Sequence, residues 1–279
     1  MSDYSTILVE KREGVTTVRF NRPEKRNAMS PTLHREMYDA LSDLQFDAST
    51  QVLVITGNPD CFSAGQDMKE FFRDLTDPRA REETRRLALA WRDEKLRYFP
   101  RPTIAAISGW CLGGGVDIVC AADIAIAAED ARFGLPEINH GGFPGGLTTK
   151  TFQELVLPRQ ALFYLMTGRT FSGQTAADIG LVTMAVPRAE LDATVLDIAN
   201  ELKQKDPNAL RACKEAFKAV MPHVGYDDAH FWVEAKAGEL RSLQGPDRRR
   251  QSIDQFLDKR YKPASEPFSS SPSAEGDAR

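Results

Sequence analysis

One stretch of the sequence, residues 103–146, limits the possible folds more than any other. The apolar run at 103–108 has the composition of a buried strand, and three glycines follow it at 113–115. The glycines open an apolar segment that carries a single acid, Asp117. Glycines let a backbone approach a ligand closely, and a helix that begins just after them adds partial positive charge. The stretch therefore predicts a strand–turn–helix unit whose N–H groups can hold a negatively charged oxygen.

Composition narrows the class of protein. The chain has 279 residues, of which 42% are hydrophobic and 27% charged, so it has ample material for a core. A net charge of −4 argues against a nucleic-acid partner. The N-terminal residues lack the pattern of a signal peptide, and no apolar run reaches membrane-spanning length. We expect a cytoplasmic protein with no membrane partner.

The cysteines indicate reduced thiols. Their spacing contains no C-x-x-C pair, and most of them lie among apolar neighbours. Buried thiols are therefore favoured over disulfides or a metal site. The four are Cys61, Cys111, Cys120 and Cys213.

The first half of the chain alternates strand and helix patterns. Runs at 7–11 and 15–20 flank a Glu–Gly pair and predict a hairpin. Ser30, followed by a proline, predicts the cap of a helix that extends to about residue 46. The continuous apolar run at 52–56 predicts a strand buried on both faces.

The same alternation continues to about residue 187. We expect a charged helix over 76–98, with Leu87, Leu89, Trp91 and Leu96 as its apolar element. Another strand is expected at 124–127. The pattern as a whole predicts an α/β domain.

Beyond that point helical patterns dominate. They cover 189–205, 207–220, 227–244 and 247–258. Residues 264–279 are rich in Ser, Pro and Glu and predict a disordered tail. We therefore divide the chain into a catalytic core at 1–200, a helical region at 201–263 and the tail.

Two carboxylates stand out near the glycines. Asp117 lies in the first turn after them, where capping a helix is an equally good interpretation. Glu137 sits in a second glycine-rich segment, where a surface salt bridge is the plainer alternative. Two carboxylates that face one pocket push their pKa values apart, which suits acid–base chemistry beside a carbonyl. Asp123, at a strand end, is expected to be structural.

Other polar groups give weaker signals. His140 could orient or titrate with Glu137, although a hydrogen-bonded residue at the rim is the commoner outcome. The remaining histidines lack ligand spacing, so no metal site is expected. A basic group could bind the phosphates of an anionic ligand or could simply be a solvated loop; it comprises Arg22, Lys25, Arg26, Lys69 and Arg73.

Taken in order, these stretches resemble the crotonase (enoyl-CoA hydratase/isomerase) superfamily over about residues 5–262. The resemblance rests on NRPEKRNAMS (21–30), VLVITG (52–57), FSAGQDMKE (62–70), PTIAAISGWCLGGGVDIVCAADIAIA (102–127), ARFGLPEINHGGFPGG (131–146), TGRTFSGQTAADIGLV (167–182) and NALRACKEAF (208–217). It implies an α/β spiral of ββα repeats and a C-terminal helical region used in homotrimers or hexamers. It also implies an acyl-CoA thioester substrate, with no further cofactor.

The resemblance assigns roles by position. It implies that the N–H groups of Gln66 and Gly114 hold the thioester oxygen as an enolate develops. It places Asp117 and Glu137 where hydratases carry their paired acids. The substrate-binding set that we expect comprises Lys25, Ala64, Gly65, Asp67, Met68, Gly113, Phe71, His140 and Trp232.

Within the superfamily the sequence motifs are most similar to those of the hydroxycinnamoyl-CoA hydratase-lyases. Those enzymes hydrate feruloyl- or coumaroyl-CoA and split the product into an aromatic aldehyde and acetyl-CoA. The chain departs from that group at three positions. Phe71 replaces a tyrosine thought to bind the phenol, His140 replaces an aromatic residue, and Asp117 replaces a serine.

From the sequence we predict a 2-enoyl-CoA hydratase-like lyase. Glu137 would activate water for attack at the β-carbon, and Asp117 would orient that water or share its proton. The alternative is the aromatic hydratase-lyase. Two further interpretations rank lower: an isomerase, because the further acid of the dienoyl-CoA isomerases falls on Gly145, and a non-catalytic acyl-CoA binder.

Overall fold

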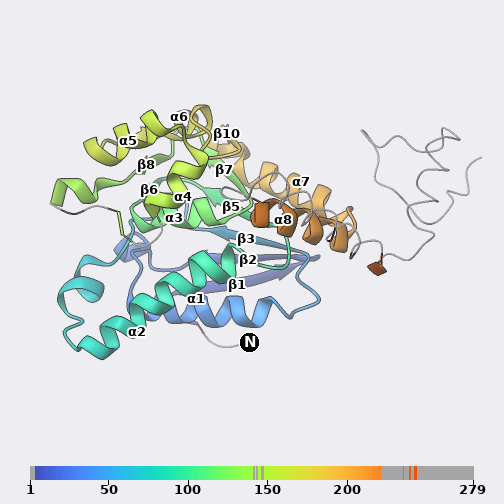
Figure 1. Cartoon of the computed structure of the whole chain (residues 1–279), viewed down its shortest axis with the longest axis horizontal. Helices are drawn as coiled ribbons and strands as arrows, with labels where there is room; N and C mark the ends of the chain where they lie inside the picture. Colours follow the sequence, from blue (N-terminus) through green and yellow to red (C-terminus); the bar gives the residue numbers. More distant parts are fainter. Residues whose placement is uncertain are drawn as a thin grey trace, which may run out of the picture. The chain divides into compact units, whose positions relative to one another are not determined.

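The computed structural model describes residues 4–140, 142, 144–145, 148–220, 235, 239 and 242–243. Internal contacts divide the chain into two compact units, Met1–Asn200 and Glu201–Arg279. All strands named below belong to the first unit (Figure 1).

Two sheets form the first unit. The larger has the order β1-β2-β3-β5-β7-β10, and the smaller has the order β4-β6-β8-β9. Neighbouring strands are parallel except for the pairs β1–β2 and β8–β9. The strands of the larger sheet are β1 (Ile7–Arg12), β2 (Val15–Phe20), β3 (Val52–Thr56), β5 (Thr103–Ile107), β7 (Ile124–Ala128) and β10 (Met184–Val186). Those of the smaller sheet are β4 (Cys61–Ser63), β6 (Trp110–Leu112), β8 (Arg132–Gly134) and β9 (Phe171–Ser172).

The chain visits both sheets in each turn. From β3 it passes to β4, from β5 to β6, and from β7 to β8, and helical segments follow each pair. The predicted spiral of ββα repeats is therefore confirmed. The helices are α1 (Pro31–Leu44), α2 (Pro78–Leu89), α3 (Gly114–Ala121), α4 (Thr148–Leu155), α5 (Pro158–Thr167), α6 (Gly173–Asp178), α7 (Leu191–Lys203) and α8 (Pro207–Val220). Shorter helical turns are η1 (Pro23–Lys25), η2 (Met68–Arg73), η3 (Ala90–Leu96), η4 (Pro136–His140) and η5 (Arg188–Glu190).

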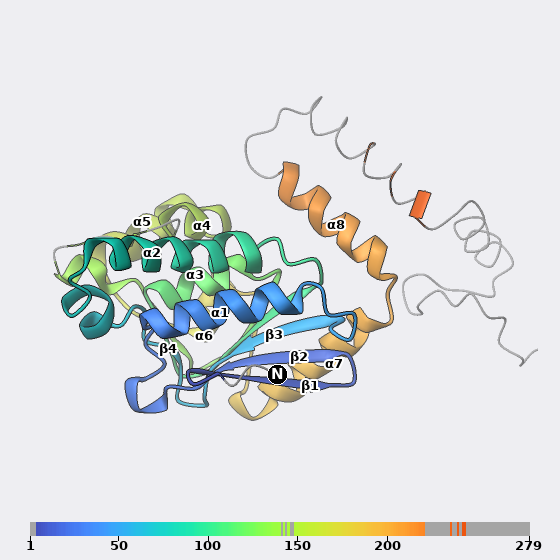
Figure 2. The ribbon, with the colours of Figure 1, turned by 90° about the horizontal axis from the view of Figure 1, so that it is seen from below.

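Local signals in the sequence account for the element boundaries. The hairpin turns at Glu13 and Gly14, both with positive φ. Ser30 caps α1 by accepting a hydrogen bond from the Leu33 N–H, as predicted. Every residue of β3 and β5 is buried, because helices and neighbouring strands cover the middle of the larger sheet. Figure 2 shows α1 running along one face of that sheet.

The segment 76–98 is helical, but its buried face differs from the prediction. Leu87 and Leu89 are only half-buried. The chain widens into the π-helical turn η3, and Trp91, Arg92 and Asp93 are all buried there. A regular amphipathic helix would have exposed one of these three consecutive residues.

The structure describes only part of the C-terminal region in which helices were predicted. Asp206 caps α8 by accepting from the N–H groups of Asn208 and Ala209, as the Asp–Pro pair predicts. The expected helices over 227–244 and 247–258 and the tail at 264–279 lie almost wholly outside the described residues. No helix in the described part is both long and apolar enough to cross a bilayer.

The cysteines are unpaired thiols. Cys61, Cys111 and Cys120 are buried, as expected, whereas Cys213 is exposed. Burial raises the pKa of the Cys61 thiol to about 11, so this thiol stays protonated near neutral pH.

A glycine controls the passage from one sheet to the other. Gly109 lies between β5 and β6 with φ +63°, and its carbonyl accepts from the Arg132 N–H. A Cβ there would stand 1.9 Å from the Asp60 carbonyl oxygen. Only glycine fits this position without moving the backbone.

We predict that Gly109→Ala lowers the free energy of unfolding by at least about 2 kcal/mol, from backbone strain plus the clash. Gly145→Ala is the matched control, because a Cβ on Gly145 would meet no atom of the described residues within 4 Å. Urea unfolding followed by circular dichroism measures both. Equal midpoints for the two variants would contradict this account of the sheet crossing.

Candidate active site

Two glycine turns meet at the end of the smaller sheet. Gly65 follows β4 with φ +90°, and Gly113 follows β6 with φ +51°. A Cβ on Gly65 would lie 2.9 Å from the Leu112 carbonyl oxygen and 3.5 Å from the Gly114 nitrogen. The Gly113 N–H donates to the Gly134 carbonyl at 2.9 Å, which ties this turn to the next strand. The backbones are therefore in direct contact, as the sequence could only suggest.

Main-chain pairing orients the first turn. The Met29 N–H donates to the Gly65 carbonyl at 2.8 Å, and the Asp67 N–H donates to the Met29 carbonyl at 3.0 Å. The intervening Gln66 N–H points away from this pairing. Within the described part of the chain, neither the Gln66 N–H, which lies between β4 and η2, nor the Gly114 N–H, at the start of α3, donates to a carbonyl of another segment. Two N–H donors from adjoining turns suit an oxyanion site.

Glu137 lies against the second turn. It belongs to η4, and its Oε1 is 2.7 Å from the point where a Cβ on Gly113 would stand. The missing side chain of Gly113 is thus the space that the carboxylate occupies. The side chain is half-buried, so a base at this position can meet both a substrate and a water molecule.

Asp117 has a different environment. It is fully buried on α3, and its Oδ1 accepts from the Thr151 hydroxyl at 3.2 Å. Its Oδ2 lies 3.2 Å from Arg92 Nε, an ion pair without the alignment of a hydrogen bond. Asp117 therefore forms an ion pair with a buried arginine, which the sequence did not predict.

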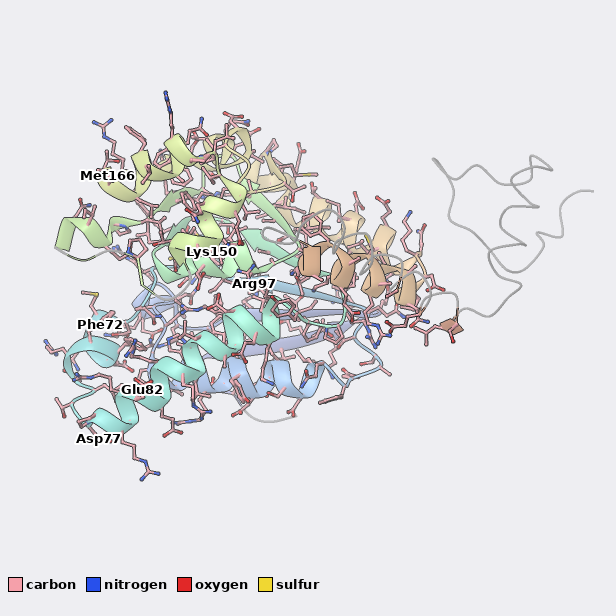
Figure 3. All side chains as sticks on the ribbon, viewed as in Figure 1. Phe72, Asp77, Glu82, Arg97, Lys150 and Met166 are labelled. Carbon is pink, nitrogen blue, oxygen red and sulfur yellow. The ribbon has the colours of Figure 1, made fainter. Side chains whose placement is uncertain are left out.

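Asp117 is part of a buried ionic cluster, which we define as Arg92, Asp93, Arg97 and Asp117. Arg92 Nη1 lies 2.9 Å from the point where a Cβ on Gly114 would stand, so the cluster adjoins the glycine turns. Asp93 Oδ1 is 4.0 Å from Arg97 Nη2. Figure 3 labels Arg97, just beyond η3, and Lys150, on α4.

Asp93 carries the least compensated charge of the cluster. Its side chain is buried, and neither carboxylate oxygen makes a hydrogen bond with the described residues. Burial, with the charge of Asp117, raises the pKa of Asp93 to about 6 in spite of Arg92 and Arg97.

A second buried network reaches Gln66. The Trp91 indole N–H donates to His34 Nδ1 at 2.9 Å, and His34 Nε2 lies 2.8 Å from Gln66 Oε1. Burial, with the charge of Arg92, lowers the pKa of His34 to about 3. His34 is therefore a neutral hydrogen-bonding residue at physiological pH.

The predicted coenzyme-binding residues are distributed around the first turn. Lys25 is exposed on η1, and the Ala64 N–H donates to the Arg26 carbonyl. Asp67 is buried and caps η2, whereas Met68 is exposed.

Asp67 is held as a carboxylate. Burial alone would raise its pKa, but the Glu70 N–H and the Arg22 guanidinium, 3.1 Å away, lower it.

The expected basic group is largely neutralised. Arg22 pairs with Asp67 and with Glu70, at 2.7 Å for the latter. Lys69 and Arg73 both pair with Asp74. Lys25 and Arg26 are exposed, and their binding of an anionic ligand stays a prediction.

The three remaining predicted residues have mixed outcomes. Phe71 is buried and packs edge-on against His34, with ring centroids 5.5 Å apart. The His140 side chain and Trp232 lie outside the described part of the structure. Among the described residues, no group of three or more His, Cys, Asp or Glu could hold a metal ion.

Comparison with known proteins fits this geometry. The sequence model of the enoyl-CoA hydratase/isomerase family matches residues 10–266. The chain belongs to this family. A hydroxycinnamoyl-CoA hydratase-lyase from Pseudomonas fluorescens is 44% identical over 91% of this chain and 93% of that protein. A 2,3-dehydroadipyl-CoA hydratase from Escherichia coli is 33% identical over 77% of this chain and 82% of its own.

Solved structures of the enoyl-CoA hydratase family share the fold. The crystal structure of an enoyl-CoA hydratase from Bacillus anthracis superposes with a TM-score of 0.82 at 30% identity, covering 91% of this chain and 97% of that one. A hydratase structure from Geobacillus kaustophilus gives 0.84 at 28% identity, covering 96% and 99%. The chain therefore shares the spiral fold of these proteins.

Sequence reasoning missed four residues of the site. His34, Trp91, Arg92 and Thr151 come from segments far apart in the chain, so no spacing links them. One signal was present: the adjacent charges Arg92 and Asp93 interrupt the apolar element of a helix expected to be buried there.

We predict that Asp93→Asn raises the melting temperature at pH 8 but not at pH 4. The folded protein binds this proton more tightly than the unfolded chain does, whose Asp pKa is near 3.9. Stability is therefore lost as pH rises from about 4 to about 6, and asparagine removes that loss. Asp43→Asn, at an exposed position of α1, is the control. A lower melting temperature for Asp93→Asn at pH 8 would show that the cluster needs this charge.

Proposed function

We propose that the protein hydrates an aromatic 2-enoyl-CoA thioester and then splits the product into an aromatic aldehyde and acetyl-CoA. The observation that carries the proposal is the position of Glu137, whose carboxylate fills the space beside Gly113 at the meeting point of two N–H donors. The hydratase-lyase that is 44% identical over nearly the whole chain favours this substrate class over the simple hydration preferred from the sequence.

Hydration needs one base and one oxyanion site. Glu137 takes a proton from water as the water oxygen bonds to the β-carbon. The electron pair of the double bond moves onto the thioester oxygen, where the Gln66 and Gly114 N–H groups stabilise the enolate. Glu137 then returns its proton to the α-carbon, which gives the β-hydroxy thioester.

Cleavage uses the same groups in the opposite sense. Glu137 takes the proton of the β-hydroxyl, the bond between the α- and β-carbons breaks, and the aldehyde leaves. The resulting enolate of acetyl-CoA occupies the same oxyanion site and receives the proton at its α-carbon. Each step takes one proton and returns one, so a single carboxylate is sufficient.

The surroundings of Asp117 support a site with one acid. Its carboxylate is fully buried and is engaged by Arg92 and Thr151. We therefore assign it the role of balancing Arg92. The hydratase-lyases, which carry serine at this position, likewise lack a second acid there.

Hydration without cleavage is the second candidate. The observation that favours it is Phe71, which offers a buried aromatic ring but no hydroxyl to a phenolic substrate. Assembly into homotrimers or hexamers and a cytoplasmic location stay predictions.

Incubation with feruloyl-CoA and, separately, with crotonyl-CoA tests the proposal. Loss of the enoyl-thioester absorbance reports hydration, and product masses report cleavage. We expect vanillin and acetyl-CoA from feruloyl-CoA. Hydration of both thioesters without cleavage would favour the second candidate, and turnover of neither would contradict both.

We predict that Glu137→Gln lowers kcat about 10²–10⁴-fold, because glutamine cannot accept the proton of water. The variant should still bind the thioester, since the oxyanion donors are intact. Glu82→Gln, on the exposed side of α2, is the matched control and should keep full activity. Full turnover by Glu137→Gln would exclude Glu137 as the base.

The assignment of Asp117 has its own test. Asp117→Asn leaves the Arg92 charge buried without its partner, so we expect a loss of about 3–5 kcal/mol in the free energy of unfolding. Arg92→Gln combined with Asp117→Asn removes both charges and should recover most stability and retain hydration. A stable double variant as inactive as Glu137→Gln would instead make Asp117 part of the chemistry.

A further inference from the structure

The buried network that ends at Gln66 determines how the carboxamide of this residue is oriented. An indole N–H can only donate, so the Trp91–His34 contact requires an acceptor at His34 Nδ1. A neutral imidazole then carries its proton on Nε2, which donates to Gln66 Oε1 at 2.8 Å. The Gln66 oxygen is thereby fixed toward His34, and its NH2 group must point the other way.

The surroundings keep His34 in this state. The rings of His34 and Trp91 are fully buried, and Phe71 packs edge-on against the imidazole. Arg92 is the charged group that acts on His34, and with burial it lowers the pKa of the imidazole to about 3. A doubly protonated imidazole would also lose its acceptor for Trp91. The chain of donors therefore keeps one direction over the whole physiological pH range.

The nitrogen of the carboxamide lies beside the second glycine turn. Gln66 Nε2 is 3.6 Å from the point where a Cβ on Gly114 would stand. The main-chain amide of residue 66 needs no particular side chain to act as a donor. The side-chain oxygen of Gln66 is held by His34, which Trp91 orients in turn, and the main-chain role does not explain this arrangement.

We propose that the Gln66 side-chain NH2 is a third hydrogen-bond donor to the thioester oxygen, and that His34 and Trp91 are its positioning residues. This rests on the proposed function, because the main-chain amides of Gln66 and Gly114 define where that oxygen binds. The hydrogen bond from this third donor strengthens as negative charge develops on the thioester oxygen. The donor therefore affects kcat more than substrate binding.

Four single variants and one double variant test the inference by steady-state kinetics with feruloyl-CoA and crotonyl-CoA. Gln66→Met keeps the chain length and the main-chain N–H but removes the side-chain donor. We expect kcat to fall about tenfold, near the net contribution of one neutral hydrogen bond, with KM changed little. Gln66→Glu should lose more, because a carboxylate cannot donate and repels the enolate.

His34 separates positioning from packing. His34→Leu should lower kcat by the same factor as Gln66→Met, and the combined variant should be no worse than either, since His34 acts only through Gln66. His34→Gln, whose amide can still donate to the Gln66 oxygen, should recover most of the activity. If His34→Leu does not fold, the two Gln66 variants and His34→Gln carry the test.

The outcomes distinguish this inference from the function on which it rests. Glu137-dependent turnover with an unchanged kcat in Gln66→Met overturns the inference alone. If the losses of kcat in His34→Leu and Gln66→Met multiply in the combined variant, His34 does not act through Gln66 and the positioning role is overturned. A parent protein that turns over neither thioester overturns the inference and the proposed function together.

Discussion

The contact between two glycine turns is the constraint on which the rest of the site depends. A side chain on Gly65 would collide with the Leu112 carbonyl, and one on Gly113 would displace the Glu137 carboxylate. Each turn follows a strand of the smaller sheet, and β4 and β6 are parallel neighbours, so the sheet brings the turns together. The spiral thus brings together Gln66, Gly114 and Glu137, which lie far apart in the sequence.

Buried charge is the second organising feature, and it has a cost. Arg92, Asp93 and Asp117 are almost completely removed from water, and the attraction of the two carboxylates to Arg92 offsets only part of the desolvation. The raised pKa of Asp93 reflects this incomplete compensation. Arg92 lies beside Gly114, so the cluster also packs against the second glycine turn.

Sequence reasoning predicted the parts of this structure that depend on local signals. The hairpin at Glu13, the Ser30 cap and the buried strands β3 and β5 follow from turn chemistry, capping and apolar runs. The spiral of ββα repeats was implied by the resemblance to a family, whereas the order of the strands in two sheets is known only from the structure. The partners of Asp117 and Gln66 could not be predicted, because ion pairs and hydrogen bonds across helices depend on packing that no spacing in the sequence records.

The central claim is that the two turns bind the thioester carbonyl through N–H donors. Vibrational difference spectroscopy of feruloyl-CoA labelled with ¹³C at the thioester carbonyl, bound to Glu137→Gln, measures this most directly. Donors aimed at the oxygen polarise the C=O bond, so the account predicts a carbonyl stretch at lower frequency in the complex than in water. A bound carbonyl with an unchanged or higher frequency would contradict it.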